Sequence, residues 1–128
     1  ADSSPAASVL LIDDDEIVLH ATNLMLETRG YRVTAAPDSA TAFAALATTA
    51  HPDIIISDYR LPGSLSGSKL ITELRARAHK PIPAIILTGD ITLRDDENLP
   101  QACMLVQKPI SPAELQQVIS RLLEGRAT

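Results

Sequence analysis

The chain has 128 residues, which suits one domain that buries about two-thirds of its unfolded surface. Its formal net charge of −5 argues against an intrinsic nucleic-acid-binding surface, and no apolar run reaches the roughly 20 residues that a membrane span needs. The single cysteine excludes an internal disulfide and fits a reducing compartment, so we expect a cytoplasmic location. Hydrophobic residues make up 45% of the chain but aromatic residues only 2%, so the core must be built from aliphatic side chains and alanine.

The first half of the chain alternates between strand and helix patterns. Residues 1–8 are typical of a flexible lead-in without an initiator Met, so we expect a domain taken from a longer protein. A strand over 9–12 precedes a helix that stops at Gly30. The residues expected on the inward face of this helix share helical spacing: Ile17, Ala21, Leu24 and Thr28. A strand over 31–35, nearer an edge of the sheet, leads to an alanine-rich helix that Asp38 or Ser39 could cap. The side chains expected to face inward from it are Ala42, Phe43 and Leu46.

The second half repeats the alternation. The apolar run over 54–56 predicts a central parallel strand, because a strand covered on both faces has no polar side. The next helix, ending near residue 78, should pack through Leu70, Ile71 and Leu74. Further strands are predicted over 84–87 and 104–107, with a short helix in the polar segment between residues 90 and 101. A capping box at Ser111 and Glu114 opens the last helix. Its expected inward residues are Leu115, Val118, Ile119 and Leu122.

Five strands and five helices in alternation predict one doubly wound α/β domain with a parallel sheet. The domain should cover residues 9–124, with a tail at 125–128. A dinucleotide-binding domain is the least favoured member of this class, because no glycine-rich loop follows the first strand.

Polar residues that can carry chemistry follow four of the predicted strands. Asp13 and Asp14 follow the first strand, and Asp58 ends the central one. Thr88 and Lys108 follow the last two strands. Because parallel strands bring their carboxyl ends to one edge, where open α/β sheets place their sites, these side chains should converge.

The converging residues support phosphoryl chemistry. Carboxylates a few ångströms apart raise each other's pKa or recruit a cation, and a few oxygen ligands suit Mg²⁺, with Mn²⁺ as a substitute. An aspartate beside such an ion can attack a phosphoryl group, while the Lys108 ammonium and Thr88 hydroxyl donate to it. Each motif alone is better explained as a turn or a solvated helix start, but their joint occurrence on successive strand ends reverses that judgement.

Four motifs together resemble the receiver domain of two-component signalling. They are Val9-Leu10-Leu11-Ile12-Asp13-Asp14-Asp15, Asp58-Tyr59-Arg60-Leu61-Pro62-Gly63, Leu87-Thr88-Gly89-Asp90 and Lys108-Pro109. Thr88 and Lys108 lie thirty and fifty residues after Asp58, close to the family spacing. The resemblance covers about residues 8–124 and implies a flavodoxin-like (βα)5 fold with strand order 2-1-3-4-5.

The resemblance also implies a role for each site residue. Asp58 would accept a phosphoryl group from the phosphohistidine of a histidine kinase or a histidine phosphotransfer domain. The ligands of Mg²⁺ would be Asp14, Asp58 and the backbone carbonyl of Arg60, with Asp13 acting through metal-bound water. Thr88 would move toward the phosphoryl group, and Lys108 would be its ion-pair partner.

Two features depart from the family pattern or extend it. Leu105 stands where the family usually carries the aromatic residue that changes rotamer on activation, which questions the usual switch. Arg60 and Asp90 each lie two residues beyond a site residue, and we hypothesise that they form an ion pair that restricts the attacking water. The motif wording resembles bacterial receivers attached to hybrid sensor histidine kinases.

Two other functions compete with a phospho-accepting domain that has no external substrate. One is a pseudo-receiver that works only as a protein-docking module, which Leu105 favours and the intact Asp58, Thr88 and Lys108 disfavour. The other is a Mg²⁺-dependent phosphohydrolase, which usually has an acid where this chain has Arg60. His20, His51 and His79 are expected on the surface, without a phosphotransfer role. No direct nucleic-acid or membrane contact is expected, and the oligomeric state stays open.

Overall fold

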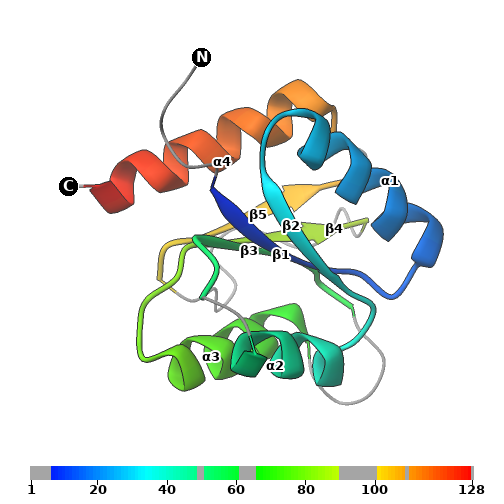
Figure 1. Ribbon diagram of the computed structural model, residues 1–128. Helices are drawn as coiled ribbons and strands as arrows, with labels where there is room; N and C mark the ends of the chain where they lie inside the picture. Colours follow the sequence, from blue (N-terminus) through cyan, green and yellow to red (C-terminus); the bar gives the residue numbers. More distant parts are fainter. Residues whose placement is uncertain (1–6, 49–50, 61–65, 90–100, 109, 128) are drawn as a thin grey trace.

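The computed structural model describes residues 7–48, 51–60, 66–89, 101–108 and 110–127. Five parallel strands form one sheet in the order β2-β1-β3-β4-β5, which confirms the expected topology (Figure 1). The strands are β1 (Ser8–Ile12), β2 (Arg32–Ala36), β3 (Ile54–Asp58), β4 (Ala84–Thr88) and β5 (Cys103–Gln107). The helices are α1 (Glu16–Thr28), α2 (Ser39–Thr48), α3 (Gly67–Ala78) and α4 (Pro112–Ala127). The further helix predicted between residues 90 and 101 falls largely outside the described residues.

The sheet lies between two helical layers, with α1 and α4 on one face and α2 and α3 on the other (Figure 1). Alternate residues of each central strand enter opposite layers: Val9 and Leu11 pack on the α1–α4 side, while Leu10 and Ile12 pack on the α2–α3 side. Both core clusters consist mainly of Leu, Ile, Val and Ala, as the composition predicts. No helix in the described parts of the chain is long and apolar enough to cross a membrane.

The inward face predicted for α1 is wrong. Leu19 and Leu26 are buried, whereas Ile17 is 82% exposed and Leu24 is 50% exposed. The helix carries two apolar stripes that overlap in sequence. The stripe that is buried or half-buried consists of large side chains: Val18, Leu19, Met25 and Leu26. It buries more apolar area than the predicted stripe would, because that stripe includes the small or polar side chains of Ala21 and Thr28. The predicted stripe therefore faces solvent.

The other helices pack as predicted. Asp38 accepts a hydrogen bond from the Thr41 amide at 2.7 Å and so caps α2, and this bond lowers the pKa of the Asp38 carboxyl. Ser111 and Glu114 exchange capping-box bonds at 3.1 and 3.3 Å, which start α4. The predicted inward residues that are buried are Ala42, Leu46, Leu70, Ile71, Leu74, Leu115 and Ile119, while Phe43, Val118 and Leu122 are partly buried. Helix α4 continues to Ala127, past the predicted end of the domain at residue 124.

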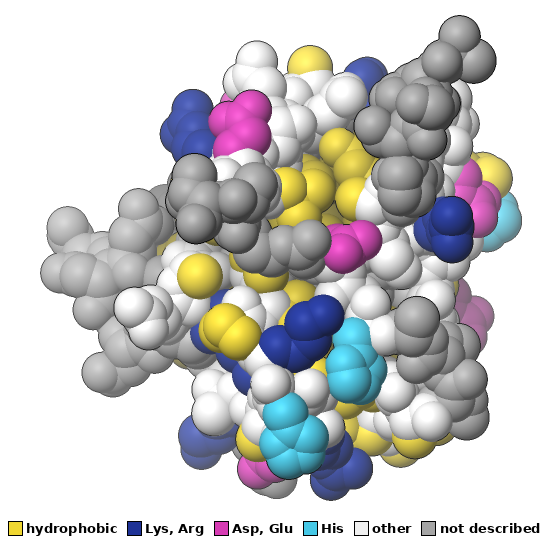
Figure 2. Space-filling view, turned by 60° about the vertical axis from the view of Figure 1, so that its left-hand side comes forward, with side chains coloured by type: hydrophobic (Ala, Val, Ile, Leu, Met, Phe, Trp, Pro, Cys, Tyr) yellow, Lys and Arg dark blue, Asp and Glu magenta, His cyan; other side chains and the backbone are white. Residues whose placement is uncertain are grey.

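The described surface at the amino ends of the strands carries basic groups. Figure 2 shows histidine side chains beside Lys and Arg side chains on the lower part of this face, where α2 and α3 lie. His20, His51 and His79 are all exposed, which confirms the expected surface positions. Cys103 begins β5 and is partly buried, and burial raises the pKa of its thiol to about 11, so the thiol stays protonated and inert.

Candidate functional site

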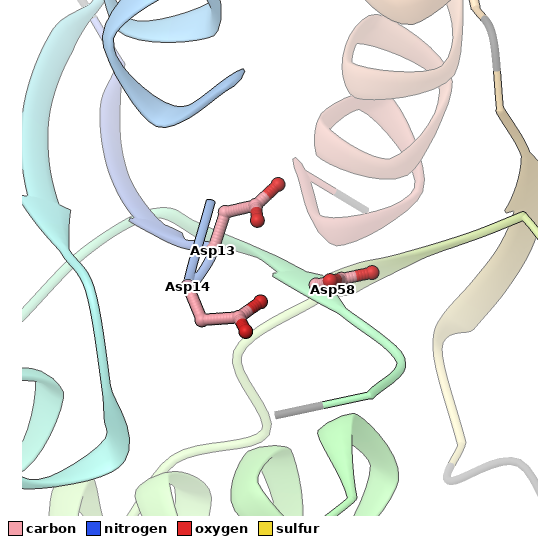
Figure 3. A group of neighbouring side chains, drawn as sticks. All are labelled: Asp13, Asp14 and Asp58. Carbon is pink, nitrogen blue, oxygen red and sulfur yellow. The ribbon is translucent and has the colours of Figure 1, made fainter. Parts of the chain in front are cut away.

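The carboxyl edge of the sheet brings three predicted acids together. β1 pairs with β3 so that Ile12 lies opposite Ser57, which places Asp13 beside Asp58. One carboxylate oxygen from each of Asp13, Asp14 and Asp58 lies within 4.8 Å of the others (Figure 3). Asp13 is buried, Asp58 is half-buried and Asp14 is exposed. Among the described residues, the cluster is therefore open to solvent at Asp14 and buried at Asp13.

Lys108 closes the other side of the cluster. The Lys108 amide donates to the Thr88 carbonyl at 2.7 Å, which continues the β4–β5 ladder by one residue. From there its Nζ reaches Asp13 Oδ2 and Asp58 Oδ1, at 3.4 Å from each. Burial lowers the pKa of Lys108, but the charges of Asp13 and Asp58 outweigh burial and raise it above its usual value, so the ammonium stays charged.

The charge at Asp58 is not fully balanced. Burial, followed by the charges of Asp13 and Asp14, raises the pKa of Asp58, and Lys108 only partly opposes this rise. Because three carboxylates face one lysine ammonium among the described residues, a further cation would relieve the repulsion. The donor set consists of carboxylate oxygens and is partly open to water, which fits Mg²⁺.

Local hydrogen bonds fix the loop that carries the acids. Asp13 Oδ1 accepts from the Asp15 amide at 2.9 Å, and the Asp15 carboxylate caps α1 by accepting from the Ile17 and Val18 amides. Asp15 therefore serves as the N-cap of α1, whereas Asp13 and Asp14 of the same acidic run belong to the site. On β3, the Tyr59 amide donates to the Leu87 carbonyl at 2.8 Å and so extends the ladder just past Asp58.

The remaining predicted residues lie around this cluster. Thr88 ends β4 with 2% exposure, one residue beyond Leu87, the register partner of Asp58. Arg60 is exposed and forms an isolated antiparallel bridge with Ser66. Its hypothesised partner Asp90 lies outside the described residues, so the ion pair remains a hypothesis. Leu105 is partly buried on β5, opposite Ile86, and packs against the α2–α3 side of the core.

Two residues near Asp58 were not identified as site residues from the sequence. The Ser57 hydroxyl donates to the Asp58 carbonyl at 2.9 Å, and Gly67 packs directly against that carbonyl. A serine at the end of an isoleucine run and a glycine at the first position of a helix are the sequence signals that could have identified them.

Comparisons with known proteins identify the family of the chain. The family model of the response regulator receiver domain matches residues 9–120. The chain is 30% identical over 95 residues to the probable transcriptional regulatory protein TcrX of Mycobacterium tuberculosis, covering 74% of this chain and 39% of that protein. It is 38% identical over 81 residues to the transcriptional regulatory protein CseB of Streptomyces coelicolor, covering 63% of this chain and 33% of that protein. The chain thus spans about a third of the length of these relatives.

Solved structures give the same result. A response regulator receiver protein from Sinorhizobium medicae is 27% identical with a TM-score of 0.83, covering 94% of this chain and 97% of that chain. The signal receiver domain of a signal transduction histidine kinase from Syntrophus aciditrophicus is also 27% identical, with a TM-score of 0.77 and coverage of 94% and 92%.

Proposed function

Because the chain belongs to the response regulator receiver domain family, whose general function is to be phosphorylated on an aspartate, we propose that Asp58 is the acceptor in this chain. The observation that carries the proposal is the position of its carboxylate, which lies within 4.8 Å of the two other acids and 3.4 Å from Lys108. The donor would be the phosphohistidine of a histidine kinase or of a histidine phosphotransfer domain.

Asp58 suits the nucleophilic role better than its neighbours. Asp13 is only 4% exposed and already accepts from the Asp15 amide and Lys108, so an incoming phosphoryl group could not easily reach it. Asp14 is exposed and has no contact with Lys108 among the described interactions. Asp58 combines partial exposure, with 16% of its side chain accessible, and an ammonium within 3.4 Å.

The transfer step follows from this placement. An Asp58 carboxylate oxygen forms the new bond to phosphorus while the phosphorus–nitrogen bond to the donor imidazole breaks, and the imidazole leaves with that electron pair. Lys108 remains charged and can donate to the phosphoryl oxygens. Mg²⁺ (or Mn²⁺), when bound, would neutralise part of the phosphoryl charge. Asp14, Asp58 and the Arg60 carbonyl would hold the ion, with Asp13 acting through metal-bound water. The Thr88 hydroxyl would donate to the phosphoryl group.

The exposed stripe of α1 supports docking of the donor. Ile17 is 82% exposed in the first turn of α1, four residues after Asp13, and Leu24 continues the stripe two turns later. Contiguous exposed apolar patches mark interaction surfaces, and Ile17, Ala21 and Leu24 share one exposed face of α1. We propose that this stripe receives the donor protein, so that its phosphohistidine reaches Asp58.

The wider context is also a proposal. Similarity extends both to transcriptional regulators and to a receiver domain of a histidine kinase, and we favour attachment to a bacterial hybrid kinase in the cytoplasm. The docking-module alternative gains only from Leu105, whereas Asp13, Asp14, Asp58 and Lys108 are all in place for chemistry. The domain would catalyse only its own phosphorylation and dephosphorylation.

The test is the intact mass after incubation with acetyl phosphate, with and without Mg²⁺. The wild type should gain one phosphoryl group only with Mg²⁺, and Asp58→Asn should gain none. Glu27→Gln is the matched control, because it removes the charge of an exposed carboxylate in the last turn of α1, at the end of the helix away from the acids. Unchanged labelling of Asp58→Asn, or no labelling of the wild type where a control receiver labels, would refute the assignment.

A further inference from the structure

The backbone on either side of the Asp58 carbonyl is held by groups that the phosphoryl-transfer step does not use. Ser57 is fully buried on β3, in a strand whose other core positions are isoleucines. Its hydroxyl donates to the Asp58 carbonyl at 2.9 Å. A buried hydroxyl is stabilising only when it is hydrogen-bonded, so this bond is the physical reason for a polar residue here.

Gly67 approaches the same carbonyl from the helical layer. A Cβ atom at this position would lie 2.5 Å from the Asp58 carbonyl oxygen and 3.2 Å from the Tyr59 Cα. Both atoms belong to the backbone, so no side-chain rotation could relieve the overlap. The Gly67 amide also donates to the Tyr59 carbonyl at 2.8 Å, and Ser66 caps α3 beside it. The first turn of α3 is therefore packed against the peptide group that joins Asp58 to Tyr59.

We propose that Ser57 and Gly67 are positioning residues that hold the Asp58–Tyr59 peptide and so aim the Asp58 carboxylate at Asp14 and Lys108. This inference rests on the proposed role of Asp58. The carboxylate is only two bonds from the Cα that this peptide fixes, so a shift of the peptide moves the nucleophile directly. The same shift would move the Arg60 carbonyl, two residues further on.

The size of the effect follows from the contact distance. Gly67→Ala must lengthen the 2.5 Å contact by at least about half an ångström to reach a distance that real Cβ atoms adopt. Misplacement of a reacting group by about 1 Å costs on the order of 100-fold in rate. We expect Gly67→Ala to slow phosphorylation roughly 10- to 100-fold, and Ser57→Ala, which removes only the hydroxyl bond, to slow it several-fold.

Gly30→Ala separates positioning from a general loss of stability. Gly30 has φ of +94° and no atom within 4 Å of an added Cβ, so its substitution strains the backbone without pressing on the site. Gly30 follows α1, which starts at the site edge and runs the length of the sheet away from it (Figure 1). The Gly30→Ala substitution should lower the melting temperature by about 2–5 °C and leave the site intact.

The experiment compares the full chain with these three variants in two assays. The first is the initial rate of labelling by acetyl phosphate at saturating Mg²⁺, and the second is the Mg²⁺ dissociation constant from an NMR titration with Mg²⁺ alone. The inference predicts that Gly67→Ala and Ser57→Ala label more slowly and bind Mg²⁺ more weakly, while Gly30→Ala matches the wild type in both. If Gly67→Ala does not fold, Ser57→Ala decides alone.

The outcomes distinguish the two proposals. Wild-type rates and Mg²⁺ affinities in folded Ser57→Ala and Gly67→Ala would overturn the positioning role, even with Asp58 confirmed as acceptor. A loss in Gly30→Ala equal to that in Gly67→Ala would overturn it as well. A wild type that binds Mg²⁺ but takes no phosphoryl group would refute the acceptor assignment, and the Mg²⁺ titrations would still decide whether Ser57 and Gly67 position the carboxylate.

Discussion

Removing the charge of Asp58 should stabilise the protein in the absence of metal. Asp58→Asn keeps the shape of the side chain and deletes its negative charge. The pKa of Asp58 is raised, chiefly by burial and then by the charges of Asp13 and Asp14, which means that its ionised form is less favourable in the folded protein than in the unfolded chain. The neutral amide does not carry this penalty.

The charges in the cluster give the size of the gain. At an effective dielectric constant of about 20, each repulsion from a carboxylate within 4.8 Å is worth at least about 3.5 kcal/mol, and the attraction to Lys108 at 3.4 Å about 5 kcal/mol. Before solvent screening, the two repulsions therefore exceed the attraction by at least about 2 kcal/mol. Because Asp14 is exposed and solvent screens it, we reduce the expected gain to about 1 kcal/mol.

Urea unfolding followed by circular dichroism, in EDTA and low salt at pH 7, measures this gain. A stabilisation of about 1 kcal/mol should also raise the melting temperature by about 3–5 °C. The difference in stability between the variant and the wild type should shrink as the pH falls through the raised pKa of Asp58 toward the usual 3.8. The wild-type carboxyl becomes protonated over this range and is then neutral, like the amide of the variant. Saturating Mg²⁺ should stabilise the wild type more than the variant.

An Asp58→Asn protein that is less stable than the wild type at pH 7 in EDTA would refute this reasoning. It would show that the pair with Lys108 outweighs the repulsion and the burial together. A gain that is unchanged between pH 7 and pH 4 would also contradict it, because the gain would then not come from ionisation.

Three further predictions test other contacts. Lys108→Met should lower the metal-free stability by about 1–2 kcal/mol, because it leaves two carboxylates without their ammonium partner, and urea unfolding in EDTA checks this. Ile17→Ser should slow transfer from a phosphohistidine donor about 10-fold, a loss of about 1.4 kcal/mol, without changing labelling by acetyl phosphate; equal slowing with both donors would contradict the docking stripe. His79→Gly should raise the unfolding free energy by about 0.5–1 kcal/mol, because His79 ends α3 with φ of 56°, and a lower melting temperature would contradict this.

The strands and their ends were predictable because their signal is local. A strand buried on both faces needs a continuous apolar run, and β1, β3 and β4 each contain such a run. The polar residue that ends each run then lies at the carboxyl edge by topology alone. The reach of Lys108 across β4 to Asp58 followed from the same argument, although its distances required the structure.

Two features could not be predicted because they depend on neighbours that are distant in sequence. Helix α1 offers two apolar stripes, and the one that packs is decided by the sheet and α4 rather than by spacing within the helix. The start of α3 marks Gly67 as a residue of interest, but its contact with the Asp58 carbonyl depends on how closely α3 packs against the end of β3, which the sequence does not encode. Both features concern how an element packs rather than whether the element exists.

The strand order has a practical consequence for labelling and fusion. β1 lies between β2 and β3 and starts at the end of the sheet opposite the acids. Helix α4 runs back from the acidic end, so Ala7 and Ala127 both lie on the side away from Asp58 (Figure 1). A dye, an affinity tag or a neighbouring domain joined at either end would therefore leave the approach to Asp58 open. Surface immobilisation through either end should preserve access for a donor protein in binding experiments.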